Sequence, residues 1–152
     1  MAFVLVVLLG SGLFVHPDQF PLFPTMGNEG ASGMVYLTQP WSPFGVSVDE
    51  DGHVVRDLRV EVEGLPTLNE GKYMVWITTP ALDPIVALGS LDRSGVVTGP
   101  TNWEQLMVIV SVEAVDRETG ARWSGPIVLR GFSAGARVTP LAQHSLFAPS
   151  PF

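Results

Sequence analysis

The chain has 152 residues, of which 46% are hydrophobic and 15% charged, and its formal net charge is −7. This length suits one domain with extra ends, and the acidic balance excludes nucleic acid or an anionic membrane surface as the main partner, because both need a basic face. The absence of cysteine excludes disulfides, a thiolate metal site and a cysteine nucleophile.

Residues 1–15 form an almost wholly apolar run without lysine or arginine. A secretory signal normally starts with basic residues, and a helix of this length would span roughly 21 Å of a ~30 Å hydrocarbon core. We expect a retained membrane anchor that contacts lipid or transmembrane subunits, with a cleaved signal peptide as the alternative. The candidate anchor residues are Phe3, Val4, Leu5, Leu8, Leu9, Leu13 and Phe14.

Residues 16–33 contain three prolines followed by glycines, a composition that argues against a regular helix or a central strand. Phe20, Leu22 and Phe23 are nevertheless large and apolar. We therefore expect an extended linker arm whose three side chains bind a partner; an arm folded back on its own domain is the alternative. No lysine or arginine precedes Arg56, so we expect a bacterial membrane-associated protein with the bulk of the chain on the periplasmic side.

Residues 34–132 read as short strands separated by turns, which predicts an all-β, antiparallel, immunoglobulin-like sandwich of seven or eight strands. Leu58, Val60 and Val62 alternate with charged residues, so this strand should bury one face. The run 72–80 is apolar on both faces and should be central, and 105–115 should be the longest strand. "DEDG" at 49–52 and "DRSG" at 92–95 each predict a hairpin. The predicted strands cover 34–40, 44–48, 53–65, 72–80, 85–91, 96–98, 105–115 and 126–132.

Residues 133–152 leave this pattern, with one charge and three prolines. A disordered tail is normally polar and charged, so an apolar one indicates a second extended arm. Ordering its backbone would cost about 1–2 kcal/mol per residue, which only extensive contact with a partner can offset. The candidate partner-binding residues are Leu141, Leu146, Phe147 and Phe152.

Within residues 60–131, "VEGLPTLNEGKYMVWITTP", "ALGSLDRSGVVTG", "VIVSVEA" and "SGPIVLRG" occur in an order that resembles the extracytoplasmic domain of anti-sigma-K-type factors. The resemblance implies an antiparallel β-sandwich outside the cytoplasm, with Tyr73 and Trp76 as core or inter-strand groups. It also implies turn positions at Gly64, Gly71, Gly95 and Gly125. It does not imply sigma-factor binding, which in that family belongs to a separate helical domain that these residues do not resemble.

Motifs for catalysis are weak. His16, His53 and His144 lie far apart, each without a histidine or carboxylate at ligand spacing. The serine contexts "GASGM" and "LGSLD" both lack the Gly-x-Ser-x-Gly spacing of a nucleophile elbow. The acidic run 49–51 could attract Ca²⁺, but a solvated turn fits it better. Trp76 should be core, whereas Trp41, Trp103 and Trp123 occupy loop-like contexts that suit protein interfaces, the membrane headgroup zone or a sugar platform. We expect no enzyme activity and no cofactor.

The sequence thus predicts a non-catalytic accessory subunit of a larger membrane protein complex, in the manner of photosynthetic or respiratory assemblies. Its partners would be the other subunits of that complex. The alternative is an envelope sensor or ligand-binding module related to anti-sigma-factor periplasmic domains. A cleft lined by tryptophan and polar residues would favour this alternative. A secreted carbohydrate- or metal-binding domain is a third interpretation.

Overall fold

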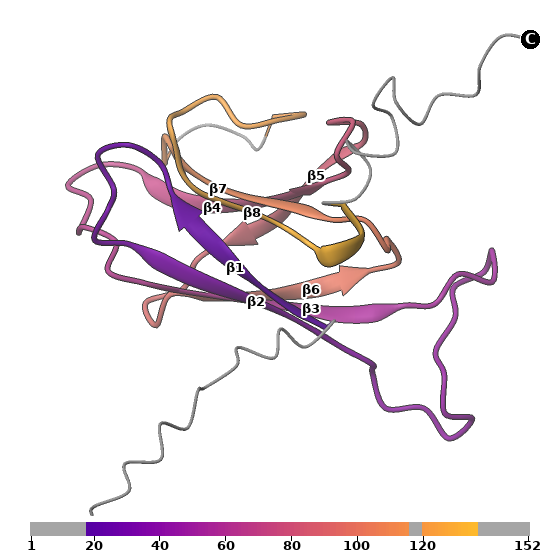
Figure 1. Cartoon of the computed structure of the whole chain (residues 1–152). Helices are drawn as coiled ribbons and strands as arrows, with labels where there is room; N and C mark the ends of the chain where they lie inside the picture. The colour runs from indigo at the N-terminus through magenta and orange to yellow at the C-terminus, as the bar shows by residue number, and fades with distance from the viewer. Residues whose placement is uncertain (1–17, 116–119, 137–152) are drawn as a thin grey trace, which may run out of the picture.

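The computed structural model describes residues 18–115 and 120–136 (Figure 1). Over these ranges the chain has eight strands, all in antiparallel pairs, and one helical turn at residues 134–136. The predicted all-β, antiparallel class is therefore confirmed. The strands are β1 (Gln19–Pro24), β2 (Ser32–Thr38), β3 (Arg56–Glu63), β4 (Lys72–Thr78), β5 (Ile85–Ser90), β6 (Val96–Thr101), β7 (Met107–Glu113) and β8 (Ile127–Phe132).

The strands form one sheet in the order β5-β4-β7-β8-β1-β2-β3-β6, so β5 and β6 are its edges. β1 joins the two halves, because residues 19–22 pair with β2 whereas Phe23 and Pro24 pair with β8. The sheet curls until its edges approach each other, and Leu88 of β5 lies directly against Gly99 of β6. The sheet is thus nearly closed, and side chains rather than ladder hydrogen bonds fill the last gap.

The turn at residues 92–95 forms, but it does not close the predicted hairpin. The Asp92 carboxylate accepts hydrogen bonds from the backbone N–H groups of Ser94 (2.8 Å) and Val96 (2.9 Å). Gly95 has a φ of +76°, and a Cβ there would overlap the carbonyl oxygen of Val62. β5 pairs with β4 and β6 with β3, so this turn carries the chain from one edge of the sheet to the other. The hairpin prediction was wrong because a turn sequence fixes a bend and leaves strand pairing open.

The other glycines expected at turns also occupy special positions. Gly64 and Gly71 have positive φ values of 72° and 98°. A Cβ at Gly125 would overlap the carbonyl oxygen of Val112, so a side chain at this position would push β7 and the following connection apart.

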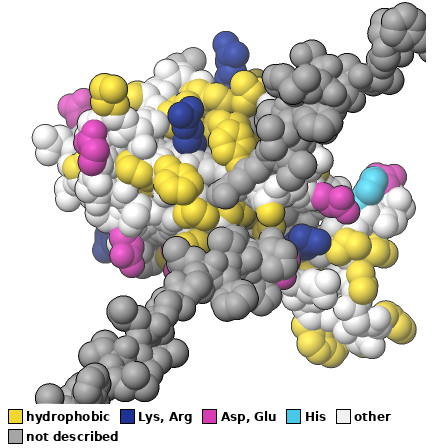
Figure 2. Space-filling model, in the orientation of Figure 1, with side chains coloured by type: hydrophobic (Ala, Val, Ile, Leu, Met, Phe, Trp, Pro, Cys, Tyr) yellow, Lys and Arg dark blue, Asp and Glu magenta, His cyan; other side chains and the backbone are white. Residues whose placement is uncertain are grey.

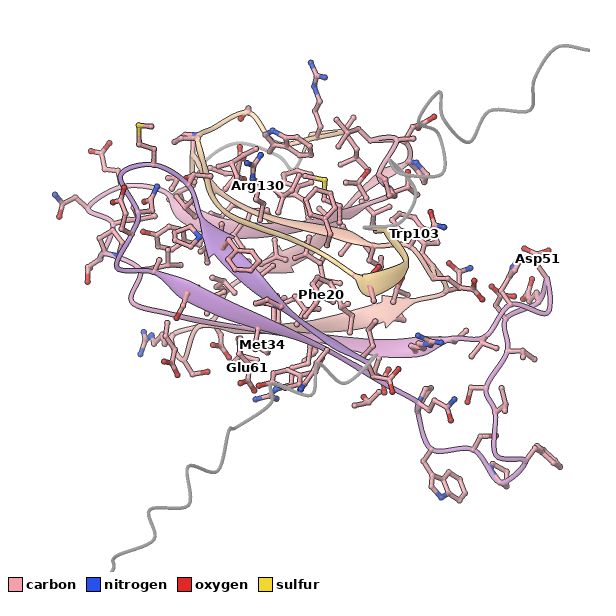
Figure 3. The ribbon with its side chains drawn as sticks, in the orientation of Figure 1. Phe20, Met34, Asp51, Glu61, Trp103 and Arg130 are labelled. Atoms are coloured by element: carbon pink, nitrogen blue, oxygen red, sulfur yellow. The ribbon has the colours of Figure 1, made fainter. Side chains whose placement is uncertain are left out.

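The interior core lies between the two halves of the sheet, as the position of Phe20 in Figure 3 illustrates. In β3 the alternation predicted from the sequence is confirmed, because every second side chain is buried. β4 is central as predicted, pairing with β5 and β7, and its β-branched and aromatic residues suit such a strand. The fully buried core residues, at 0% exposure, are Val35, Leu58, Val60, Val75, Leu106, Val108, Val110 and Leu129.

The described part of residues 16–33 differs from the arm that the sequence predicted. Residues 19–24 form β1 in the middle of the sheet, and Phe20 and Leu22 are each 2% exposed in the core, so they are not available to a partner. Phe23 is 56% exposed and does face outward. β1 can accommodate prolines because each of its residues pairs with a single neighbouring strand, either β2 or β8. About half of its backbone N–H groups are therefore not needed for hydrogen bonds between strands.

A second apolar cluster lies on the outer face of β4 and β7. Met74, Trp76 and Ile109 are no more than 5% exposed there. Trp123, from the β7–β8 connection, packs edge-on against Trp76 with ring centroids 6.5 Å apart and an interplanar angle of 67°. The expectation that Trp76 is core is therefore confirmed, and the connection covers a face that would otherwise be open.

Glu113 holds this connection in place through a chain of hydrogen bonds. The indole N–H of Trp76 donates to Ser111 Oγ (2.9 Å), which donates to Glu113 Oε1 (2.5 Å). The same carboxylate accepts from Ser124 Oγ (2.6 Å) and from the backbone N–H groups of Ser124 and Gly125. Burial alone would raise the pKa of Glu113, but these donors outweigh it and lower the pKa below its ordinary value.

Candidate functional site

The β2–β3 connection, residues 39–55, projects beyond the sheet as a long loop with two tips (Figure 1). In its first turn the N–H of Gly45 donates to the carbonyl of Ser42 (3.1 Å). Its second half forms an isolated antiparallel bridge between Val48 and Val54. The loop therefore has internal hydrogen bonds that hold its shape, although it contributes no strand to the sheet.

Large apolar side chains on this loop face solvent. Trp41 is 88% exposed and Phe44 is 92% exposed, so the loop-like setting predicted for Trp41 is confirmed. Figure 2 shows hydrophobic side chains gathered on the projecting lobe at the lower right. Exposed aromatic side chains of this size are candidates for an interaction surface. The further exposed apolar residues of the loop are Val46, Val48 and Val54.

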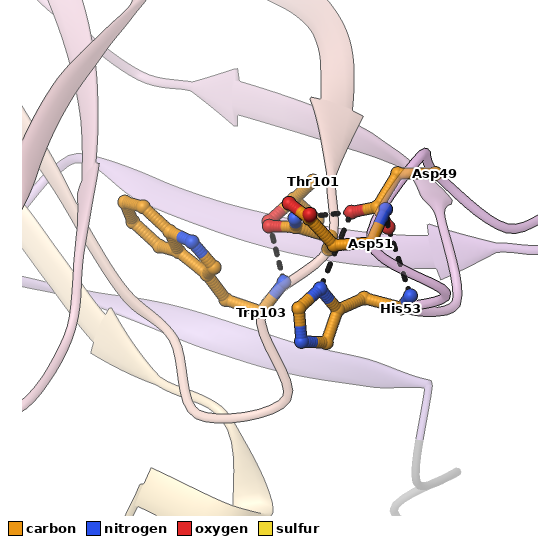
Figure 4. Close-up of polar contacts among 6 residues, drawn as sticks. Asp49, Asp51, His53, Thr101 and Trp103 are labelled. Carbon is orange, nitrogen blue, oxygen red and sulfur yellow. Dashed lines mark hydrogen bonds and ion pairs between the residues drawn. The ribbon is translucent and has the colours of Figure 1, made fainter.

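Asp49 ties the second tip of the loop to the body of the domain (Figure 4). Its Oδ1 accepts the backbone N–H groups of Asp51 (3.0 Å) and His53 (2.8 Å), and its Oδ2 accepts the side-chain amide of Asn102 (2.7 Å). Asn102 directly follows β6, so this contact joins the loop to a distant part of the chain. The Asn102 amide and the His53 backbone N–H hold the pKa of Asp49 below its ordinary value.

A lowered pKa gives the Asp49 contacts a definite pH dependence. Their contribution is complete above the unfolded-state value of about 3.9 and is lost as the pH falls through the lower folded-state value. We expect Asn102→Ala to raise the Asp49 titration midpoint, because it removes the largest stabilising hydrogen bond of the carboxylate. Carboxyl chemical shifts followed by NMR through an acid titration measure this, with Asn28→Ala as the control. An Asp49 midpoint that Asn102→Ala leaves unchanged contradicts the assignment.

Asp49, Asp51 and His53 also bring three potential metal-ligand atoms within 4.8 Å of one another. This corrects the sequence interpretation that His53 has no nearby carboxylate: the tight turn folds it back until its Nδ1 lies 3.5 Å from Asp49 Oδ2. Both Asp49 oxygens already accept hydrogen bonds, and Ca²⁺ needs six to eight oxygen ligands. We therefore assign the cluster the role of fixing the loop.

A pocket of about 280 Å³ lies beside this contact, between the loop and the start of the β6–β7 connection. Its lining combines residues 52–54 with Arg56, Asn102, Trp103 and Glu104. Trp103 is half-buried and packs partly against the core, and its backbone N–H donates to Thr101 Oγ1 (3.2 Å; Figure 4). The volume is just below the 300–1,000 Å³ typical of small-molecule sites, so a small polar ligand would fit.

Most of the remaining candidate residues fall outside the described ranges. These are the anchor candidates of residues 1–15 and the C-terminal candidates Leu141, Leu146, Phe147 and Phe152. The start of the C-terminal segment is described and packs on the domain: Ser133 Oγ accepts the N–H of Leu106 (2.9 Å), and Ala136 is 1% exposed. Across residues 18–115 and 120–136, the structure contains no helix with the length and apolar character needed to cross a bilayer.

Sequence reasoning missed the contribution of Phe44, Val46 and Val48 to the exposed surface. The pattern "FGVSV" alternates like a strand and was predicted to be one, but the structure gives it only the isolated Val48–Val54 bridge. The sequence did contain a signal against a strand here: Pro40 and Pro43 lie just before this segment, and proline disfavours hydrogen bonding between strands.

The segment that resembles the anti-sigma-K-type domain, residues 60–131, runs from the second half of β3 through most of β8 in the structure. Trp76 and the four glycine positions have the structural roles described above. Tyr73 is partly buried against the interior core, and its hydroxyl donates to the carbonyl of Pro66 (2.8 Å). The resemblance itself stays a prediction, because comparisons of this chain with family models, with curated proteins and with solved structures found no match.

Proposed function

We propose that this protein is a non-catalytic docking domain that binds another protein chain through the loop at residues 39–55. The observation that carries the proposal is the near-complete exposure of Trp41 and Phe44 on that loop. Aromatic side chains that enter a partner's pocket supply much of the binding energy at protein interfaces. The Asp49–Asn102 hydrogen bond and the internal turns hold the loop in shape before binding, which reduces the entropy lost on association.

In its fuller form the proposal makes this chain an accessory subunit of a larger membrane complex, of the photosynthetic or respiratory kind. The domain, which we propose to be an immunoglobulin-like sandwich, would lie on the periplasmic side. Residues 1–15 would enter the bilayer, and the apolar C-terminal residues would contact other subunits. The support is the apolar, uncharged character of residues 1–15 and the absence of lysine and arginine before Arg56. No cofactor takes part in this role.

The test is gentle detergent extraction of native membranes followed by mass spectrometry of the proteins that co-purify with the full chain. We expect co-purification at fixed stoichiometry with a large complex. The double substitution Trp41→Ser and Phe44→Ser should reduce recovery of the complex roughly tenfold or more, as loss of interface hot spots does.

Met26→Ser is the matched control, because Met26 is 96% exposed on the β1–β2 turn, at the opposite end of β2 from the loop. It should leave recovery unchanged. Full recovery of the complex with the double variant, folded as judged by its circular dichroism spectrum, would overturn the proposal.

A second candidate function is the ligand-binding or sensor role, favoured by the pocket that Trp103 and polar residues line. It ranks second because the pocket is small and part of Trp103 serves the core. The same extraction separates the two: a stoichiometric small molecule in native mass spectra, without a protein partner, would support the sensor role.

A further inference from the structure

A second exposed surface lies on the outer face of the half-sheet that contains β1, β8, β7 and β4. In the register of these strands Phe23 is opposite Arg130, and Arg130 is opposite Ile109. Directly paired residues point to the same face of a sheet. Since Ile109 belongs to the outer cluster with Trp76, Phe23 and Arg130 lie on that outer face as well.

This surface, here called the Phe23–Arg130 face, is apolar and carries positive charge. Phe23 is 56% exposed and Arg130 is also exposed. Arg122, next to Trp123 in the connection that covers part of this face, is exposed as well. Figure 2 shows two cationic side chains standing over hydrophobic ones in the upper part of the view, where Figure 3 labels Arg130. The carboxylate that β7 places on this face, Glu113, is buried and occupied by internal hydrogen bonds. Half-buried apolar neighbours are Met107, Trp123 and Ile127.

The loop at residues 39–55 has the complementary character. It exposes Trp41 and Phe44, carries the acidic run 49–51, and contains no lysine or arginine. When the loop contacts the Phe23–Arg130 face, apolar side chains are buried and opposite charges attract. A contact between two loops, or between two such faces, would bring like charges together, which is unfavourable.

The two surfaces cannot meet within one chain. Phe23 lies next to the β1–β2 turn, whereas the loop begins after Thr38, at the other end of β2. A strand of this length spans roughly 20 Å, and the loop projects further away from the sheet (Figure 1). A second copy of the chain can supply the missing surface to each.

We propose that the loop at residues 39–55 of one chain docks on the Phe23–Arg130 face of a second copy, head to tail. The inference rests on the proposed function, since it names the partner of the same loop. Such a heterologous contact leaves one loop and one face unused in a dimer, so it continues into a ring or an open filament.

The test is sedimentation-velocity ultracentrifugation of the purified full chain in mild detergent over a range of concentrations. The unmodified chain should form species larger than a dimer as its concentration rises. Phe44→Ser, which disables the loop, and Phe23→Ser, which disables the face, should each weaken self-association roughly tenfold or more. Met26→Ser should not. Mixing the two disabled variants should restore association but stop it at the dimer, because only one loop–face contact then remains intact.

Charge reversal supplies a second readout. Asp51→Arg and Arg130→Asp should each weaken self-association, and combining both in one chain should recover part of it. A chain that stays monomeric at all concentrations, or a mixture of disabled variants that fails to associate, would overturn the inference. If such a monomeric chain still loses its membrane complex on Trp41→Ser and Phe44→Ser substitution, the proposed docking function stands and only the identity of the partner is wrong.

Discussion

Replacing Trp76 with alanine is expected to lower the free energy of unfolding by about 3–5 kcal/mol. Trp76 is 1% exposed, its indole N–H donates to Ser111, and its ring packs against Trp123, so no rearranged neighbour can easily fill its volume. Total stabilities of single domains are about 5–15 kcal/mol, so this loss removes a large fraction of the free energy of unfolding.

Urea denaturation monitored by circular dichroism measures this loss. Trp41→Ala is the matched control: the same side chain is removed from an 88% exposed position, and the change should stay within about 0.5 kcal/mol. A loss for Trp76→Ala as small as that of Trp41→Ala would show that the outer cluster does not stabilise the domain.

Replacing Glu113 with alanine is expected to cost about 3 kcal/mol, because the donors of Ser111, Ser124 and Gly125 would lose their acceptor in a buried setting. Glu113→Gln keeps one carbonyl oxygen and should cost less. Glu63→Ala, at an exposed position of β3, is the control and should be nearly neutral. The measurement is again the free energy of unfolding in urea.

The loss should also depend on pH in a defined direction. The folded-state pKa of Glu113 is lowered, so its carboxylate stabilises the domain above the unfolded-state value of about 4.3. That stabilisation disappears as the pH falls through the lower folded-state pKa. The stability gap between the unmodified chain and Glu113→Ala should therefore narrow in acid. A gap that widens as the pH falls would mean that folding raises the pKa of Glu113 instead of lowering it.

The sequence was sufficient to predict the strands whose burial follows from the pattern of their own residues. In β3 the alternation of Leu58, Val60 and Val62 with charged residues specifies which face is buried, and in β4 the apolar character of both faces specifies a central position. β1 was missed because its prolines suggested an arm, whereas its place in the sheet depends on contacts with β2 and β8 that no local pattern reveals. Residues 105–115 were predicted to form the longest strand. Among the described residues the longest strand is instead β3, with 8 residues, and β7 within 105–115 has 7.

The candidate site was predictable only in part. Trp41 stood out because tryptophan beside proline is unusual within a strand, and the structure exposes it. Phe44 was assigned to a strand because alternation alone does not tell whether a partner strand exists. The proximity of His53 to Asp49 results from a four-residue turn, and the link to Asn102 joins segments 53 residues apart. Such long-range contacts follow from the topology, which the residue pattern leaves undetermined.

The position of β1 has a consequence for synthesis of the chain in the cell. The hydroxyl of Thr25, the residue after β1, donates a hydrogen bond to the backbone carbonyl of Ile127 in β8, 102 residues later in the chain. β1 therefore cannot complete its pairing until β8, the most C-terminal of the described strands, has been synthesised, and contacts of such high sequence separation slow folding. Until β8 is in place Phe20 and Leu22 lack part of the core that buries them, and transiently exposed apolar surface of this kind favours aggregation.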